Sequence, residues 1–242
     1  MRNIKKYRGF SLTEVLLAVG TLAIGMIFIG GTFLTGIHFA TISTERTIAA
    51  VAADEAFSKI KLYSINLTDP NLVVDQLTPF EDLSTIAVEE FAYPSVSSLS
   101  EKQYYWSALS RLVDSDSANR LVQVTVFVSR KVGNNTTYPG NSSRPIPVKV
   151  NVSTVTGAGN ENKLTITLAG EEIFINDGST IADHQTGQLY RVLKRDPAAP
   201  NVVLLDKEWL GNANSSVWVV HHQLAVGGIL VLQYIKKLSD FK

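Results

Sequence analysis

The sequence predicts an α+β protein in which one long N-terminal helix precedes a β-rich, mainly antiparallel domain. Three observations support this fold class. The 30 residues from Val15 to Thr44 contain no Asp, Glu, Lys or Arg. Helical spacing of apolar residues continues beyond this run, and no proline interrupts it before Pro70. From about residue 104 onward, short stretches of β-forming residues alternate with turn-forming Gly, Asn and Pro.

The charge of the chain is balanced overall but uneven along its length. The 242 residues carry 22 basic and 22 acidic side chains, and the first nine residues include Arg2, Lys5, Lys6 and Arg8. Setting these four aside leaves 18 basic against 22 acidic side chains, a net charge of −4. A mildly acidic body does not indicate direct nucleic-acid binding. The absence of cysteine excludes disulfides and cysteine-ligated zinc sites.

Residues 15–40 are predicted to span a membrane once. A transmembrane helix needs about 20 mostly apolar residues, and the uncharged run is longer than that. The basic cluster precedes the run, and the positive-inside rule therefore places the N-terminus in the cytoplasm. The remaining residues would lie on the other side of the membrane.

A cleaved secretory signal is the alternative interpretation of this segment. Such signals have an apolar region of about 7–15 residues, followed closely by small residues at the cleavage site. A small-residue site exists at Ala50-Val51-Ala52, but Glu45 and Arg46 separate it from the apolar run. The length of the run favours a retained span.

The stretch "RGFSLTEVLLAV" adds features that a plain anchor does not need. Gly9 follows the basic cluster, Phe10 comes next, and Glu14 is the fifth residue counted from Phe10. This pattern resembles the prepilin signature of type IV pilins and type II secretion pseudopilins, over about the first 60 residues. The resemblance implies that residues 1–9 form a leader. A prepilin peptidase would cut between Gly9 and Phe10, and the new N-terminal Phe10 would be N-methylated.

The individual positions of this motif also make chemical sense. Gly9 has no side chain, so a peptidase can approach the backbone closely. Glu14 lies about one helical turn from Phe10, roughly 6 Å deeper at 1.5 Å per residue. Intramembrane charges are costly and usually mark function or pairing. The hypothesis is that Glu14 pairs with the new Phe10 amine of a neighbouring subunit, and the alternative is that Glu14 reaches the cytoplasmic interface without a partner.

The resemblance further implies a structural role, most like that of a minor pilin or minor pseudopilin. The implied partners are other pilin or pseudopilin subunits, the prepilin peptidase and an inner-membrane assembly platform. The implied location is a single pass through the inner (cytoplasmic) membrane, with the head periplasmic or extracellular, and incorporation into a filament. Many major pilins have a proline where this chain has Gly31. The Gly30-Gly31 pair is a candidate for a weak point of the helix in its place, but without the proline the resemblance implies a kink there less strongly.

The helix is predicted to cover residues 10–64, with a second half that is amphipathic. An apolar stripe recurs at spacings of three or four, and Glu55 precedes Lys59 by four residues on another face. This half is expected to pack against the head domain. The stripe consists of Ala49, Ala53, Ala56, Phe57 and Ile60.

Residues 65–242 are predicted to form the β-rich head. Residues 66–100 are expected to be irregular with one short helix, and a first sheet is expected on the long helix, from "QYYWSALSRLV", "LVQVTVFVSR" and "VKVNVSTV". A second small β region is expected after residue 160, from "KLTITL", "EIFIN", "LYRVLKR", "NVVLLD", "SVWVVH" and "GILVLQYI". The third and fourth of these segments are expected to form a hairpin whose connection contains Pro197 and Pro200. Of Tyr104, Tyr105 and Trp106, strand alternation predicts burial of Tyr105 or of its two neighbours.

Catalytic motifs are not evident in the sequence, so no enzyme activity and no cofactor are expected. The pairs Asp183-His184 and His221-His222 are weak metal candidates, because adjacent strand residues point to opposite faces, and no metal is expected. Two other function classes stay open. One is a membrane-tethered extracytoplasmic binding protein that does not polymerise. The other is an enzyme held outside the membrane by a single anchor.

Overall fold

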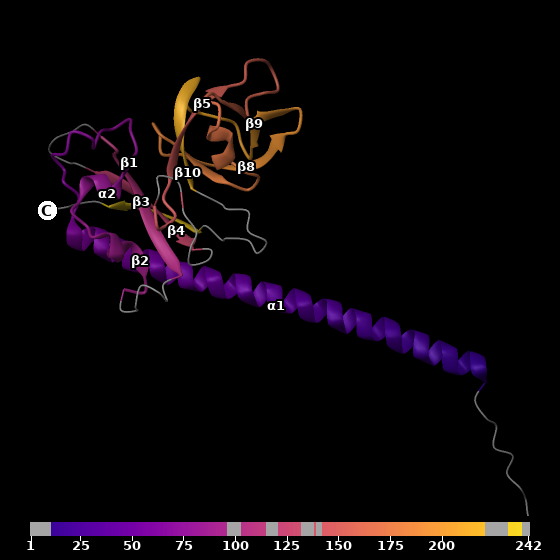
Figure 1. Cartoon of the computed structure of the whole chain (residues 1–242). Coiled ribbons are helices and arrows are strands. Elements are labelled where there is room, and N and C mark those ends of the chain that lie inside the picture. The colour runs from indigo at the N-terminus through magenta and orange to yellow at the C-terminus, as the bar shows by residue number, and fades with distance from the viewer. Residues whose placement is uncertain are drawn as a thin grey trace, which may run out of the picture. The chain divides into compact units, whose positions relative to one another are not determined.

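The computed structural model describes residues 11–95, 103–114, 121–131, 138 and 142–220, and the backbone of 232–238. The leader, residues 1–9, and Phe10 therefore lie outside the described residues. The chain divides into two units, residues 1–45 and 46–242, which are considered separately. Helix α1, Leu12–Tyr63, contributes to both units. The α+β fold class is confirmed, and the helix ends within two residues of its predicted bounds (Figure 1).

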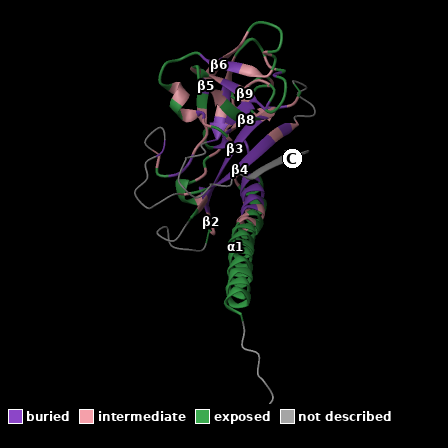
Figure 2. Ribbon diagram, turned by 90° about the vertical axis from the view of Figure 1, so that its right-hand side faces the viewer, coloured by how far each residue is buried: buried purple, intermediate pink, exposed green. Residues whose placement is uncertain are grey.

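The first unit presents apolar side chains on all sides of the helix. Every residue from Ser11 to Thr41 is exposed, with Leu12 at 79% and Ile27 at 75% (Figure 2). The helix is long and apolar enough to cross a membrane, a property that it shares with signal sequences. Hydroxyls of Thr21, Thr32, Thr35, Thr41 and Thr44 donate to helix carbonyls three or four residues earlier. These threonines need no water to satisfy their hydroxyl protons, which suits apolar surroundings.

The second unit contains an antiparallel sheet with the strand order β1-β3-β4-β11, and β2 also pairs with β3. The two long central strands are β3, Tyr104–Leu112, and β4, Val122–Arg130, as the sequence predicts. Their neighbours are β1, Thr78–Pro79, β2, Ala92–Tyr93, and β11, Leu232–Leu238. The connection before β3 contains α2, Phe80–Leu83, and the 3-10 helix η1, Val88–Phe91.

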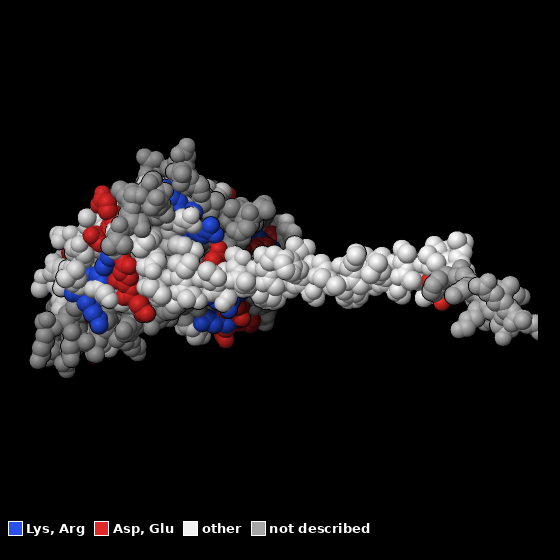
Figure 3. Space-filling model, turned by 90° about the horizontal axis from the view of Figure 1, so that it is seen from below, with Lys and Arg blue, Asp and Glu red and all other residues white. Residues whose placement is uncertain are grey.

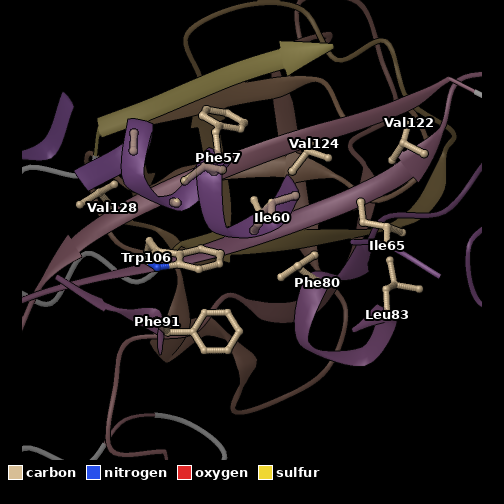
Figure 4. Packing of buried hydrophobic residues seen from close by; sticks show 14 of the residues in the cluster. Phe57, Ile60, Ile65, Phe80, Leu83, Phe91, Trp106, Val122, Val124 and Val128 are labelled. Carbon is tan, nitrogen blue, oxygen red and sulfur yellow. The ribbon is translucent and has the colours of Figure 1, made fainter. Parts of the chain in front are cut away.

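The end of α1 packs against one face of this sheet. Its buried residues include the whole predicted stripe, together with Ala52. Figure 4 shows Phe57 and Ile60 of the helix among Val124, Val128 and Trp106 of the sheet. Alanine at the contact positions lets the helix backbone approach the strands closely. The predicted packing of the amphipathic half against the head is confirmed.

Side chains on both faces of the central strands β3 and β4 are buried. This corrects the expectation that either Tyr105 or its two neighbours, Tyr104 and Trp106, would be buried. Tyr105 is 8% exposed and Trp106 is 1% exposed, although the two side chains leave opposite faces of β3. Trp106 belongs to the face under α1. On the other face, Leu109 and Phe127 pack with Ala182 and Val220 from the second β region. The prediction assumed one solvated face, and the second β region covers that face instead.

The second β region is a closed barrel with the strand order β10-β5-β6-β9-β8-β7. The predicted hairpin is confirmed as β8 and β9, although only Pro197 and Ala198 connect the strands and Pro200 lies within β9. The strands are β5, Val148–Thr154, β6, Lys163–Ile166, β7, Thr180–Asp183, β8, Leu189–Asp196, β9, Ala199–Leu205, and β10, Asn214–Val220.

The barrel differs from the sequence-based expectation in three respects. It begins at Val148 rather than after residue 160, because β5 pairs with β10 and β6 instead of joining the first sheet. The predicted C-terminal strand returns to that first sheet as β11, beside β4. The strand predicted for "EIFIN" is wrong: Glu171–Phe174 is the 3-10 helix η4, which follows Gly170 in the left-handed region at φ +91°. The Glu172 carboxylate accepts the Gly170 N–H and so stabilises the turn.

Candidate functional site

Glu14 lies in the first turn of α1 and is exposed to the surroundings. The backbone N–H groups of Glu14 and Val15 donate to the Ser11 carbonyl at 3.0 and 3.2 Å. The helix therefore begins immediately after Ser11, and a carboxylate in this turn favourably meets the positive end of the helix dipole. No hydrogen bond or ion pair joins the Glu14 side chain to the part of the chain that the structure describes. Gly9 and Phe10 lie outside that part. The structure therefore gives the position of the Glu14 carboxylate but describes no partner for it.

The helix surface beyond Glu14 carries no further charge as far as Thr44. In Figure 3 the surface of this segment is almost entirely white, without the blue and red of charged residues. A shallow depression of about 360 Å³ lies beside Gly31, between Phe28, Thr32 and Thr35. A Cβ atom added at Gly31 would meet nothing within 4 Å. The helix continues through Gly30-Gly31 without a break.

A partly buried ion cluster holds η1 against the end of α1. The Lys59 ammonium lies 3.0 Å from both the Glu55 and the Glu90 carboxylates and also donates to the Glu90 carbonyl at 2.6 Å. The Trp106 indole N–H donates to the same carbonyl at 3.0 Å. Lys59 is 8% exposed, so these partners offset the cost of burying its side chain. The predicted interaction of Glu55 with Lys59, four residues later, is confirmed. It belongs to the cluster that holds the end of the helix on the head domain.

Arg144 is a second buried cation, which sequence reasoning missed because it lies in a loop rich in Asn, Ser and Pro. Its guanidinium lies 3.9 Å from the centre of the Phe91 ring and forms an ion pair with Glu81. Burial lowers the pKa of Arg144, and the Glu81 carboxylate opposes that shift. An arginine that is 3% exposed and stacked on an aromatic ring fastens this loop to η1 and α2.

Asp183 and His184, the weak metal candidates, are instead engaged with protein groups. The buried Asp183 carboxylate accepts hydrogen bonds from the Thr186 and Ser215 hydroxyls at 2.6 and 3.1 Å. The Trp218 indole N–H donates to His184 Nδ1 at 3.0 Å, and Lys149 Nζ lies 3.0 Å from His184 Nε2. The described residues hold no cluster of three or more metal-binding side chains. His221 and His222 lie outside the described residues.

His184 is expected to make the stability of the head depend on pH. Burial, followed by the nearby Lys149 charge, lowers the pKa of His184 to about 4. The unfolded chain takes up a proton near pH 6.5, whereas the folded chain does so only near pH 4, so stability falls as the pH drops through this window. Because His184 is half-exposed, we expect a loss of about 1–2 kcal/mol between about pH 7 and pH 4.5.

Denaturant unfolding of the wild type and of His184→Gln at both pH values measures this effect. Glutamine retains hydrogen-bonding capacity but does not titrate, so the loss on acidification should be smaller in the variant by about 1–2 kcal/mol. An equal loss in both proteins would rule out His184 as the cause.

Comparison of the chain with known protein families, with curated proteins and with solved structures found no match.

Proposed function

We propose that this protein is a structural subunit, a minor pilin or pseudopilin, of a type IV pilus or a type II secretion filament. A prepilin peptidase would remove residues 1–9, and the mature subunit would assemble through its N-terminal helix. The observation that carries this proposal is the position of Glu14. It is the only charged side chain between Leu12 and Thr44, and it occupies the first turn of an exposed apolar helix.

The energetics of Glu14 favour assembly over simple anchoring. A carboxylate near the end of a plain anchor gains only the helix-dipole interaction of about 0.3–1 kcal/mol, whereas taking its charge from water into an apolar medium costs several kcal/mol. Cleavage after Gly9 would create an amine at Phe10, one turn before Glu14. Pairing this amine with the Glu14 carboxylate of the next subunit would compensate both charges and would fix the axial position of that subunit.

The two halves of α1 suit different tasks in such a subunit. Residues 12–44 expose apolar side chains that a bilayer or the helices of neighbouring subunits would cover. Residues 49–60 bury their apolar stripe against the sheet of their own head. The partners in this proposal are the prepilin peptidase, an inner-membrane assembly platform and other subunits. The chain would reside in the inner membrane until it is incorporated into a filament.

A membrane-tethered binding protein that does not polymerise is the second candidate function. A polar pocket on the outer surface of the barrel favours a binding role for the head. Such a protein would need the apolar helix only as an anchor. The Glu14 carboxylate and the Gly9-Phe10 pair would then have no function in the protein, so we rank this candidate second.

Fractionation of cells that make the tagged chain tests the proposed function. We expect the chain in filaments sheared from the cell surface or, for a secretion filament, in filaments isolated after overproduction of the major subunit. Deletion of the gene should then reduce surface filaments or protein export, and the process that fails identifies the system. Recovery of the chain only from membranes, with both processes intact, would contradict a filament role.

A further inference from the structure

The barrel carries a concave polar pocket of about 490 Å³ on its outer surface. Its floor is formed by β5 and β10, where Asn151 is paired with Ser216 in the antiparallel register. The alternate residues Val150, Val152 and Val217 are buried in the barrel core, so Asn151 and Ser216 face outward. Small polar side chains on the floor leave this part of the surface hollow.

Two connections form the walls of the pocket and are tied to its floor. On one side, the Thr167 N–H donates to the Asn151 carbonyl at 3.0 Å. On the other side, the His184 N–H donates to the Ser216 carbonyl at 3.0 Å, and Gln185 follows His184 along the wall. Backbone hydrogen bonds therefore hold both walls in place, and the pocket is formed in the absence of a ligand.

The polar groups on the floor are already oriented. The Ser216 hydroxyl donates to Asn151 Oδ1 at 3.0 Å. This bond directs the Asn151 NH₂ group away from Ser216, and it leaves lone pairs on the Ser216 hydroxyl oxygen free to accept. The side chains of Gln185 and Asn214, which also line the pocket, form no hydrogen bond with the rest of the described chain. The pocket thus offers donors and acceptors side by side.

The charges around the pocket select against ions. None of the described residues that line it is Asp, Glu, Lys or Arg. Three charged groups contact lining residues: Lys149 lies at His184, the Glu171 carboxylate accepts the Asn151 N–H at 2.9 Å, and the Asp183 carboxylate accepts the Ser215 hydroxyl at 3.1 Å. The two carboxylates disfavour an anion. Asp183 is fully buried and accepts from the Thr186 and Ser215 hydroxyls, so it presents no open ligand to a cation. Among the described lining residues only Val152 is apolar, and its side chain is buried in the barrel core, so a lipid or aromatic ligand would gain little.

From this arrangement we propose that the pocket binds a neutral polyhydroxylated ligand, a saccharide. Each sugar hydroxyl both donates and accepts a hydrogen bond, which matches the neighbouring amide and hydroxyl groups of Asn151, Ser216 and Asn214. The open, shallow shape admits the end or side of a glycan chain. This binding function goes beyond the filament role and does not depend on polymerisation.

Binding of the full-length chain to a glycan array tests the proposal, in a detergent without a sugar headgroup. The array carries neutral glucose, mannose, galactose and N-acetylglucosamine oligosaccharides, together with sialylated and sulfated glycans. We expect binding to at least one neutral class, with a Kd on the order of a millimolar or tighter for the free sugar. The variant Gln185→Ala/Asn214→Ala should weaken that binding at least about 10-fold, which corresponds to about 1.4 kcal/mol.

Asn201→Ala is the matched control, because Asn201 is exposed on β9, opposite β10 in the strand order of the barrel. This variant should bind as the wild type does, and all variants should keep the wild-type melting temperature. Failure of the wild type to bind any neutral glycan on the array would overturn the proposal. Binding restricted to acidic glycans, or binding that the double variant leaves unchanged, would also overturn it.

Discussion

Replacing Glu14 with leucine is expected to reduce incorporation into filaments by about 100-fold or more. The substitution would leave the Phe10 amine of the adjoining subunit without its counter-charge in an apolar environment. Removing one partner of a buried ion pair costs about 3–5 kcal/mol, and every 1.4 kcal/mol corresponds to a factor of ten. Membrane insertion should persist, because leucine only lengthens an apolar run that already spans a bilayer. Quantification of the chain in sheared filaments and in membranes measures both quantities.

Two further substitutions separate charge from shape at this position. Glu14→Gln keeps the size of the side chain and removes its charge, so it should fail nearly as severely as Glu14→Leu. Glu45→Gln removes the next carboxylate, beyond the apolar run, and should assemble normally. Normal incorporation of Glu14→Leu would refute the pairing of Glu14 with Phe10.

Replacing Trp106 with alanine is expected to lower the free energy of unfolding by about 3–5 kcal/mol. Trp106 is among the largest fully buried side chains, and its ring lies 4.6 Å from Phe91 and 6.0 Å from Phe80, between centroids. It also donates to the Glu90 carbonyl, within the Lys59 cluster that holds η1 to α1. The substitution would leave a cavity directly beneath the end of the helix, which other side chains would fill only partly.

Denaturant unfolding of the full-length chain in detergent measures this loss. Leu193→Ala serves as the control, because Leu193 is 52% exposed on the barrel and its truncation should change stability by less than about 0.5 kcal/mol. A loss below about 1 kcal/mol for Trp106→Ala would contradict the packing of the helix end on the sheet.

The features that the sequence predicted correctly are local ones. The stripe from Ala49 to Ile60 follows from helical periodicity, and strand β4 follows from the β-forming residues of "LVQVTVFVSR". The β8–β9 hairpin joins segments that are neighbours in sequence. The motif around Gly9 and Glu14 is likewise a short linear pattern. Its processing and pairing remain predictions.

The features that sequence reasoning missed depend on distant partners. β11 pairs with β4, and closure of the barrel requires β10 to pair with both β5 and β7. No periodicity within a strand specifies such partners. The polar pocket depends on the same pairing, since Asn151 and Ser216 meet across 65 residues of sequence. Burial on both faces of β3 and β4 was missed for a related reason, because the sequence does not reveal that the barrel packs on Leu109 and Phe127.

The mass of the intact protein extracted from membranes tests the central claim most directly. We predict a chain that lacks the nine residues MRNIKKYRG, begins at Phe10 and carries one additional methyl group on its N-terminal amine. Only this product offers Glu14 the amine that the proposed pairing requires. A mature chain that begins at Met1, or at any residue other than Phe10, would contradict the assignment of this protein to a processed filament subunit.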